Sequence, residues 1–229
     1  MPTRPAVDFS RSDAWLPGMI RRLSAVLLLA LSLTASASAE LRLRPEQAQK
    51  IGRRLWQNEC AGTVEGLTSW NKGEDFPSLG IGHFIWYPKG VPQTFEESFP
   101  GMIAFLQKRG ANPPEWVLRT PHCPWATRSA FLAERNGPRL ASLRTFLSKT
   151  VGLQAEFAAH RARQALPKLL AAAPRGERAA LQRKYDAVST TPQGVYALVD
   201  YVNFKGEGVN PKERYKGRGW GLLQVLQEM

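Results

Sequence analysis

Residues 58–88, NECAGTVEGLTSWNKGEDFPSLGIGHFIWYP, contain the change of periodicity that decides the fold. Before this stretch, apolar residues recur at helical spacing over residues 44–59, with Pro45 suited to the first turn and Gly62 to a left-handed cap. Within it, residues 67–70 and 77–85 are typical of two strands around a polar turn. The sequence therefore predicts a helix that ends near Glu59, followed by a small β-hairpin.

The rest of the chain is predicted to be helical, with no internal repeat and no long linker. Apolar periodicity and turn residues predict further helices over residues 98–109, 127–135, 138–150, 153–172 (interrupted by Pro167), 177–188, 193–204 and 221–228. The predicted fold class is α+β, a mainly helical domain with a small hairpin. Ligand sites commonly form between such parts, so we expect a cleft between the hairpin and the helices.

The first 39 residues have the pattern of an export signal. Arg21 and Arg22 precede an apolar run over residues 23–33, and small residues over 37–39 precede Glu40. Residues 1–18 show no such pattern and could lie upstream of the true start. About 11 apolar residues are too few for a membrane span, which needs about 20. We therefore expect a periplasmic or secreted protein, one domain over residues 40–229, and no transmembrane segment in the mature chain.

The charge indicates an anionic partner. The 229 residues include 31 basic and 19 acidic residues, and removal of residues 1–39 reduces the net charge from +12 to +10. A field of this sign attracts polyanions, which outside the cytoplasm include peptidoglycan, lipid head groups and nucleic acid. It would repel polycationic chitosan. Nucleic acid is not the expected partner, because the basic residues are dispersed and form no recognised binding motif.

The cysteine and histidine content argues against a metal site or another cofactor. Two cysteines cannot form a four-thiolate zinc site or an iron–sulfur cage, and His83, His122 and His160 do not have metal-ligand spacing. Export makes a disulfide between Cys60 and Cys123 possible, and two separate buried thiols are the alternative.

Glu59 is the candidate general acid. The carbonyl end of a helix dipole disfavours a negative charge, so a glutamate in the last turn has a raised pKa, more so if it is partly buried beside aromatic residues. A carboxyl group with a raised pKa can donate a proton near neutral pH. The alternative is a solvated helix end.

A helix ending in glutamate, a short hairpin and then Ser78-Leu79-Gly80-Ile81-Gly82-His83 resembles the catalytic segment of the lysozyme-like superfamily, and of phage-type lysozymes most of all. Asn58-Glu59-Cys60 is also similar to the Glu-Ser that ends the corresponding helix in goose-type lysozymes and lytic transglycosylases. The resemblance implies that Glu59 is the acid and that Ser78, which replaces the family's threonine, is the hydroxyl on the water side of the sugar. It covers about 45 residues.

Two features of the resemblance leave alternatives open. Glu65-Gly66-Leu67 also resembles the family's Glu-Gly-Leu after the helix, so Glu65 competes with Glu59 for the role of acid. The family's second polar group would fall at Lys72, so Glu74 or Asp75 in the hairpin turn would have to replace it.

Residues around this segment are candidates for substrate binding. Gly80 and Gly82 could admit a polymer or a neighbouring backbone, or could form a bulge against the helix. Of the six nearby aromatic residues we expect one or two to contact a sugar, with Trp86 and Tyr87 favoured and Trp70 a further candidate, although burial accounts for most aromatics. His83 is expected to hydrogen-bond the helix that bears Glu59.

A second cluster lies near the C-terminus. Asp200 and Asn203 share a helix face, and Lys205 and Glu207 follow, so the cluster could orient a glycan or tune the pKa of the acid. The alternative is a capped helix with solvated charges. A third set is interpreted as a solvated helical face and consists of Arg161, Arg163, Arg175, Arg178, Arg183 and Lys184.

These features predict a peptidoglycan-cleaving glycosidase, either a muramidase or a lytic transglycosylase, which uses Glu59 as general acid. The alternative is a non-catalytic protein that binds peptidoglycan or a related glycan on a lysozyme-like scaffold. An exported nucleic-acid binder is a third, less favoured hypothesis.

Overall fold

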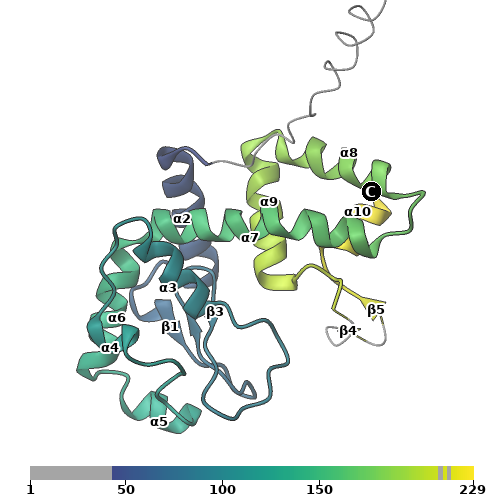
Figure 1. Ribbon diagram of the computed structural model, residues 1–229. Helices are drawn as coiled ribbons and strands as arrows, with labels where there is room; N and C mark the ends of the chain where they lie inside the picture. The colour runs from purple at the N-terminus through teal and green to yellow at the C-terminus, as the bar shows by residue number, and fades with distance from the viewer. Residues whose placement is uncertain (1–42, 211–213, 216–217) are drawn as a thin grey trace, which may run out of the picture. The chain divides into compact units, whose positions relative to one another are not determined.

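The first described helix, α2 (Pro45–Glu59), ends where the sequence predicts, and its last carbonyls are capped by left-handed residues. Ala61 and Gly62 both have positive φ, and the Gly62 N–H donates to the Trp56 carbonyl at 3.0 Å. A computed structural model describes residues 43–210, 214–215 and 218–229 (Figure 1). The predicted export signal lies outside the described residues.

A three-stranded antiparallel sheet takes the place of the predicted hairpin. Its strands are β1 (Thr68–Ser69), β2 (Ser78–Leu79) and β3 (Phe84–Ile85) in that order, after the short 3-10 helix η1 (Glu65–Leu67). Leu79 is paired with Thr68 on one side and with Phe84 on the other. The single strand predicted over residues 77–85 is therefore wrong, because a turn over residues 80–83 divides it.

The remaining described helices agree with the predicted fold class, α+β and mainly helical. They are α3 (Phe99–Gln107), α4 (Glu115–Leu118), α5 (Arg128–Ala133), α6 (Pro138–Lys149), α7 (Val151–Ala172), α8 (Arg178–Ser189), α9 (Pro192–Lys205) and α10 (Leu222–Glu228), with a two-stranded sheet of β4 (Arg214–Tyr215) and β5 (Arg218–Gly219). Helix α7 runs through Pro167 instead of being interrupted there. Pro167 is on the exposed side of α7, while its neighbours Leu166 and Leu169 remain buried in the core.

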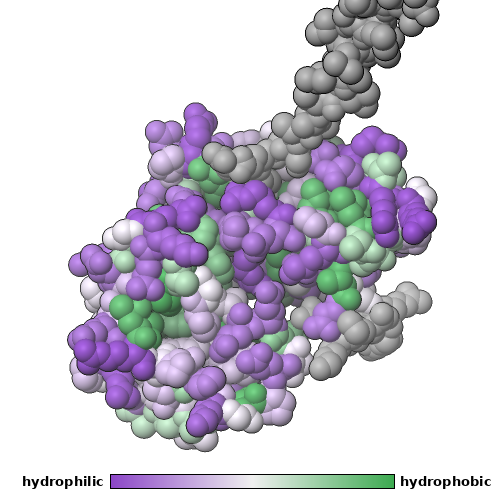
Figure 2. Space-filling view, in the orientation of Figure 1, coloured by the Kyte–Doolittle hydropathy of each residue, from purple (hydrophilic) through white to green (hydrophobic). Residues whose placement is uncertain are grey.

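The core is organised around α7. This helix packs against α2, α3, α8 and α9, and so joins the part of the chain that carries the sheet to the C-terminal helices (Figure 1). Its buried face consists largely of alanine, including Ala155, Ala158 and Ala162, which allows neighbouring helices to approach closely. The visible face of the surface is mainly hydrophilic (Figure 2). No helix in the described ranges has the length and apolar character that crossing a bilayer requires.

The two cysteines are separate buried thiols, which was the alternative to a disulfide. Cys60 contacts the Gly80 carbonyl at 3.6 Å, and Cys123 contacts the Trp125 carbonyl at 3.6 Å. Burial raises the pKa of each thiol to about 12, so both remain protonated and unreactive at neutral pH.

Candidate active site

A cleft of about 490 Å³ lies between the sheet and the helices. The sheet side contributes its first turn, β2 and β3, and the loop before α3 adds a third segment. The helical side contributes α7, the end of α9 and the residues that follow. The lining residues used below are Asn71, Glu74, Phe76, Ser78, His83, Phe95, Glu96, Ser98, Arg161, Lys168, Asn203, Phe204, Lys205 and Glu207.

The structure brings five residues of the sequence hypothesis to this cleft, from two separate segments of the chain: Glu74, Ser78, His83, Asn203 and Glu207. Ser78 is 4% exposed and belongs to the central strand of the sheet, where it is paired with Ser69 and Ile85. Glu74 accepts a hydrogen bond from the Asn71 carboxamide at 3.2 Å.

Glu59 is partly buried at the end of α2, at the edge of this region. Burial raises the pKa of its carboxyl group, the negative charge of Asp200 raises it further, and the positive charge of Lys205 opposes both effects. The C-terminal cluster therefore lies close enough to influence the pKa of Glu59. Glu59 itself is not among the described residues that line the cleft.

His83 connects Glu59 with the cleft. Its ring lies against the end of α2, where Nε2 is 3.9 Å from the Cys60 Sγ and the Glu59 backbone influences the ring's pKa, and the ring contacts Phe204 edge-to-face at a centroid distance of 5.7 Å. Burial lowers the pKa of the ring, and the Glu59 carbonyl and the charge of Glu74 oppose this shift. The lowered pKa favours the neutral ring at pH 7.

The two glycines before His83 accommodate this protein's own side chains. Gly80 has φ +72°, and a Cβ there would lie 2.4 Å from Oε1 of Gln154; a Cβ on Gly82 would lie 2.6 Å from the Phe84 ring. They belong to a turn closed by the His83 N–H and the Gly80 carbonyl, and not to a strand interior. The expectation that they admit a polymer is therefore corrected: they admit neighbouring groups of the fold.

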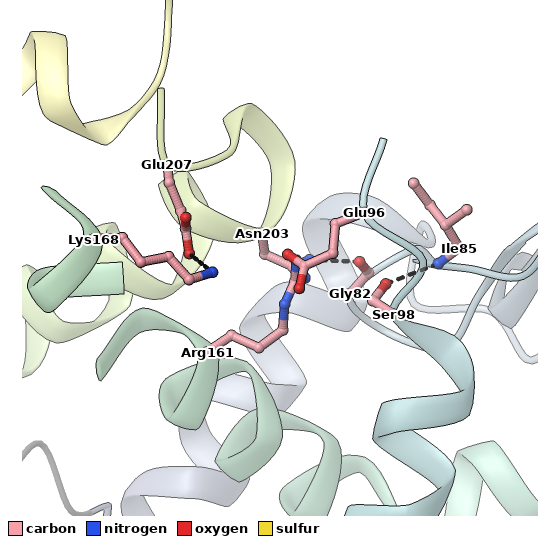
Figure 3. Close-up of polar contacts among 8 residues, drawn as sticks. All are labelled: Gly82, Ile85, Glu96, Ser98, Arg161, Lys168, Asn203 and Glu207. Carbon is pink, nitrogen blue, oxygen red and sulfur yellow. Dashed lines mark hydrogen bonds and ion pairs between the residues drawn. The ribbon is translucent and has the colours of Figure 1, made fainter. Parts of the chain in front are cut away.

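The helical wall carries charged groups that sequence reasoning did not assign to the site (Figure 3). Arg161 on α7 donates to the Asn203 carboxamide oxygen at 3.0 Å and pairs with Glu96 at 3.2 Å, while Asn203 donates to the Gly82 carbonyl. Two helical turns further along α7, Lys168 forms an ion pair with Glu207 at 2.7 Å. The interpretation of Arg161 as a solvated residue is wrong, because its side chain is only 17% exposed. Its spacing of seven residues from Lys168 was the available signal, since it places both on one face of a helix.

The structure removes Glu65 from the cleft. Glu65 is exposed in η1 and lies outside the cleft-lining residues that the structure describes. Burial lowers the pKa of Arg144, whose Nε donates to the Thr68 hydroxyl at 2.7 Å, and the negative charge of Glu65 opposes this shift. Lys72 and Asp75 are exposed. Glu74 is thus the described hairpin carboxylate that faces the cleft.

The three aromatic residues predicted to contact a sugar are buried, so that prediction is corrected. Trp70, Trp86 and Tyr87 are 5%, 1% and 2% exposed. Trp70 donates its indole N–H to the Glu74 carbonyl at 2.7 Å, and Trp86 packs on Phe99 at a centroid distance of 4.7 Å. Each ring therefore stabilises the walls of the cleft and offers no face to a ligand.

Acidic, histidine and cysteine side chains do not gather into a potential metal site anywhere in the described ranges. The chemistry that the arrangement can perform is proton transfer by carboxyl groups and hydrogen bonding by the charged helical wall. Comparison of the chain with protein-family models, with curated proteins and with solved structures found no match.

Proposed function

We propose that this protein is an exported enzyme that cleaves the glycan strands of peptidoglycan and uses Glu59 as general acid. The observation that carries the proposal is the position of Glu59: a partly buried carboxyl group with a raised pKa ends α2, and His83 joins that helix end to a cleft of about 490 Å³. A cleft of this size is typical of ligand sites. The resemblance to the catalytic segment of lysozymes supports the same assignment.

In the proposed reaction, Glu59 protonates the glycosidic oxygen as its bond to the anomeric carbon breaks. Glu74 is the proposed second carboxylate, since it lines the cleft near enough to His83 for its charge to affect the pKa of that ring. A separation of about 6.5–9.5 Å between the two carboxyl groups would give an inverting hydrolase, and about 5 Å a retaining one. Without a contribution from Glu74, intramolecular attack by the muramyl hydroxyl would give a lytic transglycosylase.

The proposed location and substrate follow from the chain as a whole. The signal-like residues 1–39 favour export to the periplasm or beyond the cell, and the net charge of +10 that remains favours an anionic wall polymer. The cleft contains cations on its helical side, among them Arg161 and Lys168.

The test is digestion of purified sacculi by the wild-type protein, Glu59→Gln and Glu65→Gln. Release of soluble muropeptides by the wild type and by Glu65→Gln, with a loss of at least about 100-fold in Glu59→Gln, is expected, because general acid catalysis contributes about 10²–10⁴-fold. Equal release by Glu59→Gln and the wild type would contradict the assignment. Anhydro ends on the products would identify a transglycosylase, and reducing ends a hydrolase.

A second candidate function is glycan binding without cleavage. It is favoured by the position of Glu59 outside the described lining residues, and by the ion pairs that already engage Glu96 and Glu207. Sedimentation of the protein with sacculi, without release of any muropeptide, would support this function over the enzyme.

A further inference from the structure

One aromatic ring of the cleft remains exposed. Of the three phenylalanines that line it, Phe76 is 6% exposed and Phe204 is partly buried, whereas Phe95 is 45% exposed. Phe95 belongs to the loop between β3 and α3. A large apolar side chain at the edge of a cleft has a hydrophobic face that a ligand could cover.

The loop holds Phe95 in place. The Phe95 N–H donates to the Tyr87 hydroxyl at 3.1 Å, and the Tyr87 N–H donates to the Glu97 carboxylate at 2.7 Å. The Phe95 ring contacts Phe76 edge-on, with centroids 6.0 Å apart. Tyr87 was expected to contact a sugar; its buried ring instead anchors the backbone of the exposed one. An aromatic group that is fixed before binding loses little conformational entropy when a ligand stacks on it.

Polar groups adjoin this ring. Glu96, the next residue, pairs with Arg161 across the cleft, and Arg161 also donates to Asn203 (Figure 3). Glu96 is 63% exposed, so its carboxylate keeps acceptor capacity toward solvent or a ligand. A pyranose ring presents one C–H face and an edge of hydroxyl groups. An exposed aromatic face beside a carboxylate and a guanidinium matches both surfaces.

We propose that Phe95 is the stacking platform of a saccharide subsite, and that Glu96 and Arg161 hydrogen-bond the hydroxyl edge of the same pyranose ring. The inference rests on the proposed function and assigns a binding position within it. The ligand class is an oligosaccharide of pyranose rings bound by one apolar face. Because the stacking needs no charge on the sugar, a neutral oligosaccharide is expected to bind.

The experiment measures binding of tetra-N-acetylchitotetraose by isothermal titration calorimetry. The parent protein carries Glu59→Gln to prevent turnover. In this background, Phe95→Ala is expected to weaken binding about tenfold, which corresponds to about 1.4 kcal/mol, and Phe95→Trp is expected to retain binding because it keeps an aromatic face. Leu118→Ala is the matched control, because Leu118 is 48% exposed on α4 and lies outside the described cleft lining.

Several results would overturn the inference. Affinity of Phe95→Ala within twofold of the parent, with an unchanged circular dichroism spectrum, would eliminate the platform. If sacculus digestion still depended on Glu59, the proposed function would survive that result. Failure of the parent to bind the tetrasaccharide at millimolar concentration would overturn the subsite. If adenosine monophosphate bound with the same dependence on Phe95 and the saccharide did not bind, the ligand that stacks on Phe95 would be a nucleobase and not a sugar.

Discussion

Replacing Gln154 tests whether the turn that carries His83 is held in place from α7. Gln154 is fully buried, and its Oε1 accepts the Ile81 N–H at 3.0 Å. Its Nε2 donates to the Leu147 carbonyl at 2.7 Å and to the Thr150 hydroxyl at 3.0 Å. The side chain thus fixes the middle of the turn to the N-terminal part of α7, and a Cβ on Gly80 would collide with it.

The expected cost of Gln154→Leu comes mainly from the turn. The Leu147 carbonyl keeps its bond from the Thr150 N–H at 3.2 Å, whereas the Ile81 N–H loses the carboxamide that accepts it. A buried donor without a partner costs about 1–3 kcal/mol of unfolding free energy. For a domain of about 190 residues this corresponds to a decrease of roughly 2–12 °C in Tm. Urea denaturation measures the change, and Gln107→Leu, on the exposed side of α3, is the control.

Gln154→Glu adds a pH dependence with a defined sign. An ionised carboxylate would keep the bond from Ile81 but would face the Leu147 carbonyl, so burial and repulsion raise its folded-state pKa above the unfolded value of about 4.3. The stability relative to the parent is then fully present below about pH 4.3 and is lost as the pH rises through the folded pKa. The difference in unfolding free energy between this variant and the parent should therefore shrink from pH 7 to pH 4.

Two results would refute this reasoning. If Gln154→Leu unfolds at the same urea concentration as the parent, the turn does not depend on Gln154. If the deficit of Gln154→Glu is independent of pH, the carboxyl group does not lie against the Leu147 carbonyl. The ring signals of His83 in NMR spectra report the turn directly, and they should move in Gln154→Leu but not in Gln107→Leu.

Three further substitutions test the electrostatics and the backbone of the site. Asp200→Asn removes a charge that raises the pKa of Glu59, so the alkaline limb of the pH profile of sacculus digestion should move to lower pH. An unchanged alkaline limb would show that the charge of Asp200 does not influence the catalytic carboxyl group. Burial lowers the pKa of His83, so its contribution to stability is present above about pH 6.5 and is lost as the pH falls toward the folded pKa. Between those values the wild type should lose up to about 1.4 kcal/mol per pH unit more than His83→Asn in urea titrations, and parallel curves would contradict the burial of a neutral ring. Gly80→Ala should destabilise the fold by about 1–3 kcal/mol more than Gly73→Ala, because both glycines have positive φ but, of the two, only Gly80 has another group within 4 Å of an added Cβ. Equal losses of stability in thermal melts of the two variants would mean that backbone strain alone, and not contact with Gln154, explains the effect.

Local sequence signals predicted the helices well. The apolar period and the left-handed residue Gly62 located the end of α2 at Glu59. Helix α9 begins at Pro192 and ends at Lys205, each one residue outside the predicted range of 193–204. Helix α4 was missed because four residues are too few to show a helical period. The turn between β2 and β3 was missed because Gly80 and Gly82 were interpreted as points of close approach along one strand, whereas they belong to the turn that divides it.

The site was harder to predict because contacts across the fold create it. Arg161 meets Asn203 from 42 residues away and Lys168 meets Glu207 from 39 residues away, and no local pattern encodes these distances. The aromatic residues show the same difficulty. Trp86 and Phe95 both follow the glycine turn, yet only tertiary packing decides that the first is 1% exposed and the second 45%.

The two halves of the cleft contribute different properties. Residues 58–88 supply Glu74 and the turn, while α7 and α9 supply cations and the two carboxamides, Gln154 and Asn203, that hold the turn. Stability alone does not explain the pair between Arg161 and Glu96, because an ion pair with a carboxylate that is 63% exposed contributes little to folding. Its position across the cleft, next to the exposed Phe95 ring, is explained if both residues contact a ligand. Since α7 packs against both α2 and α9, the same helix that carries this arginine also fixes the distance between the proposed acid and the ligand.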